Sequence, residues 1–62
     1  MLDYEARLFR ADGTLSVVAP VMATNEFDAK VFAARLLIND IEYILLLRDG
    51  EEIATVRKRR AT

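Results

Sequence analysis

The sequence of 62 residues contains no cysteine and no histidine. The first absence excludes disulfide bonds and thiolate metal ligands, and the second removes the commonest metal ligand and general base. A chain this short buries only about 60% of the surface that it exposes when unfolded, so a single core is marginal. Small domains that lack disulfides and metals are often completed by a partner subunit, and we therefore expect self-association.

The sequence is also poor in nucleophiles and in glycine. Ser16 is the only serine and falls within a predicted strand, while Gly13 and Gly50 lie in two separate turns and form no phosphate-binding loop. Glu51 and Glu52 follow a turn, where solvated carboxylates are ordinary. We expect a protein that is not an enzyme and that has no catalytic residue, no metal site and no cofactor.

No long hydrophobic run is present. The most apolar segment, residues 36–47, is interrupted by Asn39, Asp40 and Glu42 and is too short to cross a bilayer. The N-terminus lacks the basic region and apolar run of a secretory signal. The absence of cysteine is typical of a reducing compartment. The sequence therefore predicts a cytoplasmic protein that makes no contact with a membrane.

The charges are unevenly distributed along the chain. Residues 1–56 contain ten acidic and five basic residues, whereas residues 57–62 contain four basic residues and no acidic one. An acidic body therefore carries a basic C-terminal end.

Residues 2–22 predict a β-hairpin. Apolar and polar residues alternate in its first half, as in a half-buried strand, and Asp12-Gly13 is the preferred pair for a two-residue type I′ turn. Pro20 cannot donate a ladder hydrogen bond, so the second strand is expected at an edge or to end there. The turn predicts three cross-strand pairs, namely Leu8–Val17, Ala6–Ala19 and Tyr4–Val21.

Residues 23–40 predict a helix, with Thr24 as N-cap and Asn39 as a left-handed stop. Two apolar stripes run along it at a spacing of roughly 100° per residue. The expected core stripe consists of Phe27, Val31, Ala34 and Ile38. The second stripe, nearly opposite, consists of Ala29, Phe32, Ala33 and Leu36.

Residues 41–58 predict a second hairpin around Asp49-Gly50. Residues 43–47 are apolar on both faces, which is typical of a strand that is covered on both sides. The expected cross-strand pairs are Arg48–Glu51, Leu46–Ile53, Ile44–Thr55 and Glu42–Arg57.

The predicted fold class is therefore α+β, in the order ββαββ. Two Asp-Gly hairpins form a four-stranded, mainly antiparallel sheet with one helix across a face, and the strand order is left open. Residues 1–58 form a single domain, and residues 59–62 form a basic end that is expected to fray.

The third strand is apolar on both sides, so the inner and outer faces of the sheet could be exchanged. One assignment is preferred. The preferred inner face carries Tyr4, Leu8, Val17, Leu45, Leu47 and Val56 against Phe27, Val31 and Ile38 of the helix. The preferred outer face carries Ile44, Leu46 and Ile53, with Phe9 and Val18.

The arrangement of strand, Asp-Gly turn and strand, then the helix opening ATNEFDA, then a second strand, Asp-Gly turn and strand, resembles a group of short bacterial proteins without an assigned function. The resemblance implies no catalytic residue, and it covers most of the chain through turn and cap signals.

The surplus of apolar residues predicts a homodimeric, non-enzymatic interaction or structural module. An unknown protein partner is left open as well. Either the outer sheet face or the helix supplies the interface. The candidate interface residues are Phe32, Leu36, Ile44, Leu46 and Ile53.

The basic end suggests an alternative function, weak nucleic-acid binding by the dimer. The candidate polyanion contacts are Arg57, Lys58, Arg59 and Arg60. Arg57 is expected to pair with Glu42 and Lys58 to cap the strand end, and the acidic body would repel phosphates. A solubilising end is the preferred interpretation.

Overall fold

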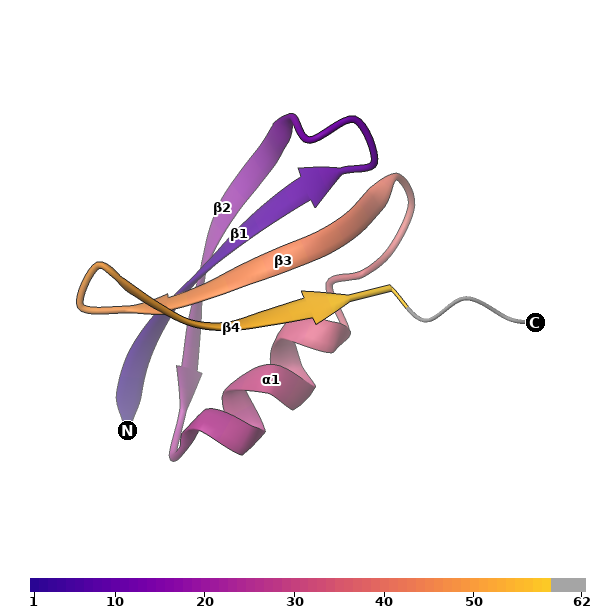
Figure 1. The fold of residues 1–62 in the computed structure, drawn as a ribbon. Coiled ribbons are helices and arrows are strands. Elements are labelled where there is room, and N and C mark those ends of the chain that lie inside the picture. Colours follow the sequence, from indigo (N-terminus) through magenta and orange to yellow (C-terminus); the bar gives the residue numbers. More distant parts are fainter. Residues whose placement is uncertain (59–62) are drawn as a thin grey trace.

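The computed structural model describes residues 1–58 and confirms the predicted ββαββ order of an α+β fold (Figure 1). The elements are β1 (Leu2–Arg10), β2 (Leu15–Ala23), α1 (Glu26–Ala34), β3 (Ile41–Arg48) and β4 (Glu51–Arg57). The predicted fraying of residues 59–62 falls outside the described residues.

The four strands form one antiparallel sheet in the order β2-β1-β3-β4, with α1 against one face (Figure 1). The two hairpins therefore meet through their first strands, an order that the sequence left open. β2 is an edge strand, as Pro20 predicted, and it continues past Pro20 to Ala23.

The backbone of Pro20 fits this edge because its nitrogen faces away from β1. The Arg10 N–H donates to the Thr14 carbonyl at the start of the hairpin, so the backbone groups of Arg10 point toward β2. In an antiparallel strand every second residue points the same way, and Ala6 therefore also directs its N–H and carbonyl toward β2. Glu5, which opposes Pro20, directs its groups toward β3 instead. No ladder bond is lost at Pro20.

The predicted register of the first hairpin is confirmed, but its turn type is wrong. Leu8–Val17, Ala6–Ala19 and Tyr4–Val21 all pair as expected.

In that turn Gly13 has a φ of 87°, whereas Asp12 is not among the described residues with positive φ. The Gly13 N–H donates to the Arg10 carbonyl at 2.9 Å, and the Asp12 carboxylate accepts from the Thr14 N–H at 3.0 Å. These bonds, together with a register shift between Leu8 and Phe9, replace the two-residue loop.

The second hairpin has the predicted turn but not the predicted register beyond it. Asp49 and Gly50 both have positive φ, 53° and 79°, as a type I′ turn requires, and Arg48 pairs with Glu51. A bulge at Ile53 then shifts β4 by one residue. The expected pairs Leu46–Ile53, Ile44–Thr55 and Glu42–Arg57 are replaced by Leu46–Ala54, Ile44–Val56 and Tyr43–Arg57.

The helix is shorter than predicted, and its N-cap is Asn25 rather than Thr24. The Asn25 carboxamide oxygen accepts from the Asp28 N–H at 2.8 Å, while the Thr24 hydroxyl donates to the Asp28 carboxylate at 2.9 Å. α1 ends at Ala34. Asn39 adopts the expected left-handed conformation, with a φ of 55°, in the connection to β3.

The helix packs on the sheet through alanines, so the predicted core stripe was the wrong one. Ala29 and Ala33 are fully buried, whereas Phe27 and Ile38 are 72% and 57% exposed. Small side chains let α1 approach the sheet closely. The core cluster consists of Tyr4, Ala6, Leu8, Val21, Ala23, Ala29, Ala33, Ile41, Ile44 and Leu46.

The faces of β3 are inverted relative to the preferred prediction. Ala6 opposes Leu46 and Leu8 opposes Ile44, and directly opposed residues share a face. Ile44 and Leu46 therefore face α1 with no exposed surface, while Leu45 and Leu47 lie on the other side.

Candidate interaction surfaces

Two of the predicted interface residues are core residues. Ile44 and Leu46 are the largest fully buried side chains of the described chain, and Ile53 is half-buried against the same core. Their assignment to an outer face is therefore wrong. The pairing of Ile44 with Leu8 and of Leu46 with Ala6 places both on the helix side of the sheet.

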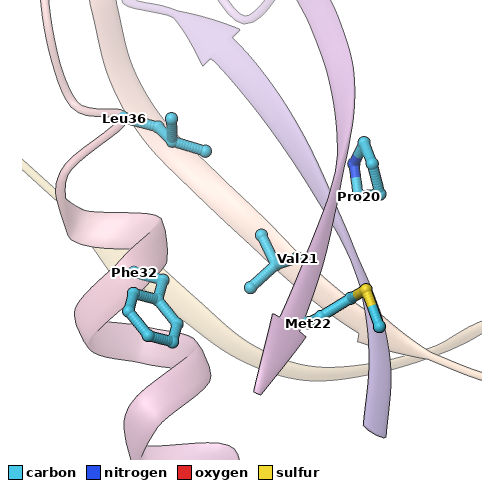
Figure 2. Close-up of a pocket in the computed structure, with 5 residues that line it drawn as sticks. All are labelled: Pro20, Val21, Met22, Phe32 and Leu36. Atoms are coloured by element: carbon cyan, nitrogen blue, oxygen red, sulfur yellow. The ribbon is translucent and has the colours of Figure 1, made fainter. Parts of the chain in front are cut away.

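The other two, Phe32 and Leu36, lie together beside the edge strand. With Pro20, Val21 and Met22 they line an open hollow of about 280 Å³ between α1 and β2 (Figure 2). The guanidinium of the neighbouring Arg35 lies 5.6 Å from the centre of the Phe32 ring. Leu36 also lines a second hollow, of about 220 Å³, toward Val17 and Ile38.

Exposed apolar residues lie on α1 and shortly after its end, and sequence reasoning had assigned three of them, Phe27, Val31 and Ile38, to the core. We call Phe27, Val31, Phe32 and Ile38 the α1 patch; each is between 39% and 72% exposed. An ion pair between Glu26 and Lys30, at 3.2 Å, borders it. The signal that could have revealed the patch is the i, i+4 alanine pair on the opposite side of the helix, which permits close packing.

The sheet face opposite α1, which we call the open face, is covered by no described element (Figure 1). The register assigns residues to it in cross-strand rows. The first row is Phe9–Tyr43–Arg57, the second is Val18–Arg7–Leu45–Thr55, the third is Pro20–Glu5–Leu47–Glu52 and the fourth is Met22–Asp3. The sequence had placed Phe9 and Val18 on an outer face, and this placement agrees with the register.

The first row of the open face is a stack of side chains across three strands. The rings of Phe9 and Tyr43 are nearly parallel, with centroids 4.9 Å apart and an interplanar angle of 7°. The Arg57 guanidinium lies 5.3 Å from the Tyr43 ring centre, on the strand beyond. Cation–π attraction of this kind favours the position of Arg57 beside Tyr43 at the end of the row.

Only part of the basic end is described, and it is tied to the body of the protein. Arg57 opposes Tyr43 rather than Glu42. The Lys58 N–H donates to the Glu42 carbonyl at 2.9 Å, and the Lys58 ammonium donates to the Asn39 carbonyl at 3.2 Å. The other two candidate polyanion contacts, Arg59 and Arg60, lie outside the described residues.

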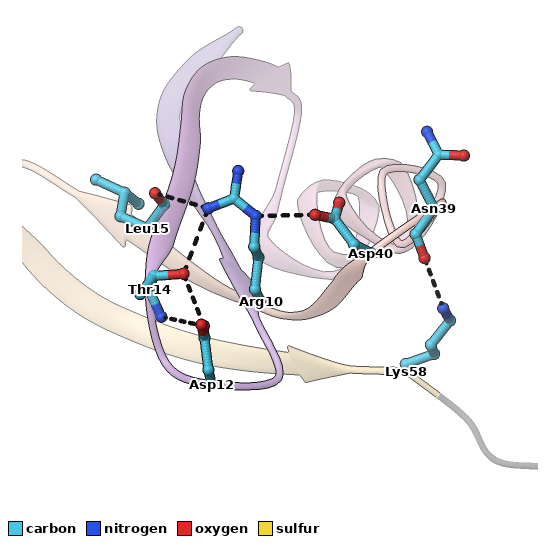
Figure 3. Close-up of polar contacts among 7 residues, drawn as sticks. All are labelled: Arg10, Asp12, Thr14, Leu15, Asn39, Asp40 and Lys58. Atoms are coloured by element: carbon cyan, nitrogen blue, oxygen red, sulfur yellow. Dashed lines mark hydrogen bonds and ion pairs between the residues drawn. The ribbon is translucent and has the colours of Figure 1, made fainter.

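A polar cluster joins the first turn to the connection that precedes β3 (Figure 3). The Arg10 guanidinium pairs with Asp40 at 2.8 Å and donates to the Thr14 hydroxyl at 3.3 Å. Asp12 accepts from the same hydroxyl at 2.7 Å. This hydrogen bond, followed by the Thr14 backbone N–H, lowers the pKa of Asp12 below 3.8. The cluster is exposed and satisfied internally, which is typical of a structural clamp.

Two further features concern ligands and membranes. Residues 1–58 contain no group of three or more acidic, histidine or cysteine side chains that could hold a metal ion. No helix in the described residues has the length and apolar character needed to cross a membrane.

No protein-family model, curated protein or solved structure matches this chain.

Proposed function

We propose that this protein is a small, non-enzymatic interaction module that forms a homodimer through the α1 patch. The observation that carries the proposal is the exposure of two phenylalanines on a nine-residue helix whose buried positions are alanines. Large exposed apolar side chains gathered on one short helix are typical of an interface. A second copy is the expected occupant because a two-fold axis lets one patch cover itself.

The charges of α1 support an antiparallel pairing of two copies of the helix. Glu26 and Asp28 lie in its first turn, and Arg35 caps its last turn. Antiparallel packing brings the acidic start of one helix toward Arg35 of its partner and opposes the two helix dipoles. Apolar residues in the centre with charges at the rim are the usual composition of a protein interface.

Sedimentation velocity at micromolar concentration tests the dimer. Phe27→Glu places a charge at the most exposed residue of the patch, where it would be desolvated in the dimer, so we expect a smaller sedimenting species with an unchanged circular dichroism spectrum. Ala11→Glu adds the same charge at an exposed position in the first turn, away from the patch, and serves as the matched control.

The outcome separates this proposal from its alternatives. A well-folded monomer of the natural sequence at that concentration would rule out self-association. An oligomer that is insensitive to Phe27→Glu would leave self-association standing and remove the α1 patch as its interface.

A further inference from the structure

We infer that the open face of the sheet is a second, self-complementary interface, which binds another copy of the chain with the basic end of one face over the acidic end of the other. This interface is separate from the α1 patch, because α1 lies against the opposite side of the sheet (Figure 1). It therefore goes beyond the proposed dimer and does not depend on it.

The open face has an apolar centre whose residues are not part of the core between the sheet and α1. Leu47 is only 4% exposed, yet it is outside the cluster of residues that packs beneath α1. Leu45, Phe9 and Tyr43 are half-buried on the same face, and Val18 is 47% exposed. Side chains that are already half-buried lose little conformational freedom when a partner covers them.

Charges of opposite sign are separated along the strands of this face. Arg57 closes the first row, whereas Glu52 stands in the third row of the same strand. Asp3 lies beyond, in the fourth row. Between them Arg7 and Glu5 form an ion pair at 2.5 Å, which leaves the two ends to set the polarity of the face.

The separation of a basic end from an acidic end makes a second copy of the chain the partner that fits this face. Two such faces can pack about a two-fold axis that crosses the strands, so that the strands of the two sheets run in opposite directions and each basic end meets an acidic end. Aligned packing of two sheets leaves roughly 10 Å for the interdigitating apolar side chains. Opposite charges at complementary positions fix such a register and disfavour the alternative one.

A nucleic acid fits the open face less well than a second copy does. Phosphates would be repelled by Glu52 and Asp3 at the acidic end of the face. The Tyr43 ring is already stacked on Phe9 and contacted by the Arg57 guanidinium, which leaves less of it for a base to stack on. A surface with both signs of charge complements itself better than it complements a polyanion.

Two independent isologous interfaces on opposite sides of one chain link copies alternately through one interface and then the other. We therefore expect the natural sequence to sediment as a species larger than a dimer at micromolar concentration. Interrupting either interface alone should leave a dimer, and interrupting both should leave a folded monomer.

Charge reversal on β4 provides the test. Arg57→Glu and Glu52→Arg each place like charges against each other across the interface, and each should weaken this association by about tenfold. The double variant, Arg57→Glu with Glu52→Arg, reverses both ends of the face and should restore it. Arg48→Glu, which makes the same charge change on the helix side of the sheet, is the matched control.

Sedimentation of these variants beside Phe27→Glu distinguishes the two proposals. A dimer that Arg57→Glu dissociates and Phe27→Glu does not would support the open face and remove the α1 patch. A dimer with the opposite response, or a double variant that fails to recover, would overturn the open-face interface. A monomeric natural sequence would overturn both.

Discussion

Single residues decide how closely the helix approaches the sheet. Ala29 and Ala33 have no exposed surface, and they are the two buried residues of α1. The bulky residues of the same helix are consequently left outside. A periodic pattern identifies the apolar stripes of a helix but cannot rank them when the smaller side chains face the core.

Enlarging one of these alanines should destabilise the fold. Ala33→Leu inserts three heavy atoms into a packed layer and is expected to lower the free energy of unfolding by about 1–3 kcal/mol. Ala34→Leu makes the same change at an exposed neighbouring position and should have little effect. Urea unfolding of both variants gives the comparison, and equal midpoints would contradict the packing of α1.

The first turn predicts a pH dependence at one side chain. Hydrogen bonds from Thr14 lower the pKa of Asp12, so the folded state binds the proton less tightly than the unfolded state does. The associated stabilisation is present above pH 3.8, the ordinary value, and is lost as the pH falls through the lower pKa of the folded state.

Carboxyl-carbon NMR titration of Asp12 measures this effect. Thr14→Val removes the hydroxyl and should raise the midpoint of Asp12 toward its ordinary value, while Thr14→Ser keeps the hydroxyl and should leave the midpoint low. An unchanged midpoint in Thr14→Val would show that the Thr14 hydroxyl is not the main cause.

At the level of the elements, the hairpins were predicted well and their irregularities were not. Both turn positions, the register of β1 with β2 and the edge position of β2 follow from Asp-Gly pairs, alternation and Pro20. The β4 bulge at Ile53 does not, because one extra residue in a strand changes no composition and leaves the turn intact. Long-range pairing of β1 with β3 decided which face of β3 is inner.

The inner face of β3 gives a quantitative prediction. Leu46 is fully buried and Leu45 is half-buried on the other side of the sheet. Leu46→Ala should therefore lower the free energy of unfolding by about 2–5 kcal/mol, the usual range for a buried leucine. Leu45→Ala should cost clearly less in the monomeric background of Phe27→Glu combined with Arg57→Glu. The reverse order in urea unfolding would mean that the faces of β3 are exchanged.

For the whole molecule, sequence reasoning anticipated the surplus of apolar surface better than its location. Phe32 is exposed and Leu36 is half-buried beside β2, whereas Ile44 and Leu46 are in the core. Composition and length predict that one small domain leaves apolar residues uncovered. Which residues remain uncovered depends on the register of all four strands and on the side of α1 that meets them.

The charge distribution of the whole molecule limits what its basic end can bind. Arg57 is held by Tyr43 and Lys58 by the Asn39 carbonyl, so we expect only two of the four C-terminal cations to contact phosphates. The logarithm of duplex affinity should then fall with the logarithm of salt concentration at a slope of about −1.8, rather than the slope of about −3.6 expected if all four contributed. The acidic body should keep this binding weak.

Fluorescence anisotropy with a short duplex at several salt concentrations gives the slope, and a chain ending at residue 58 is the control. Tight binding with the steeper slope, lost in that control, would make nucleic-acid binding the function of the basic end.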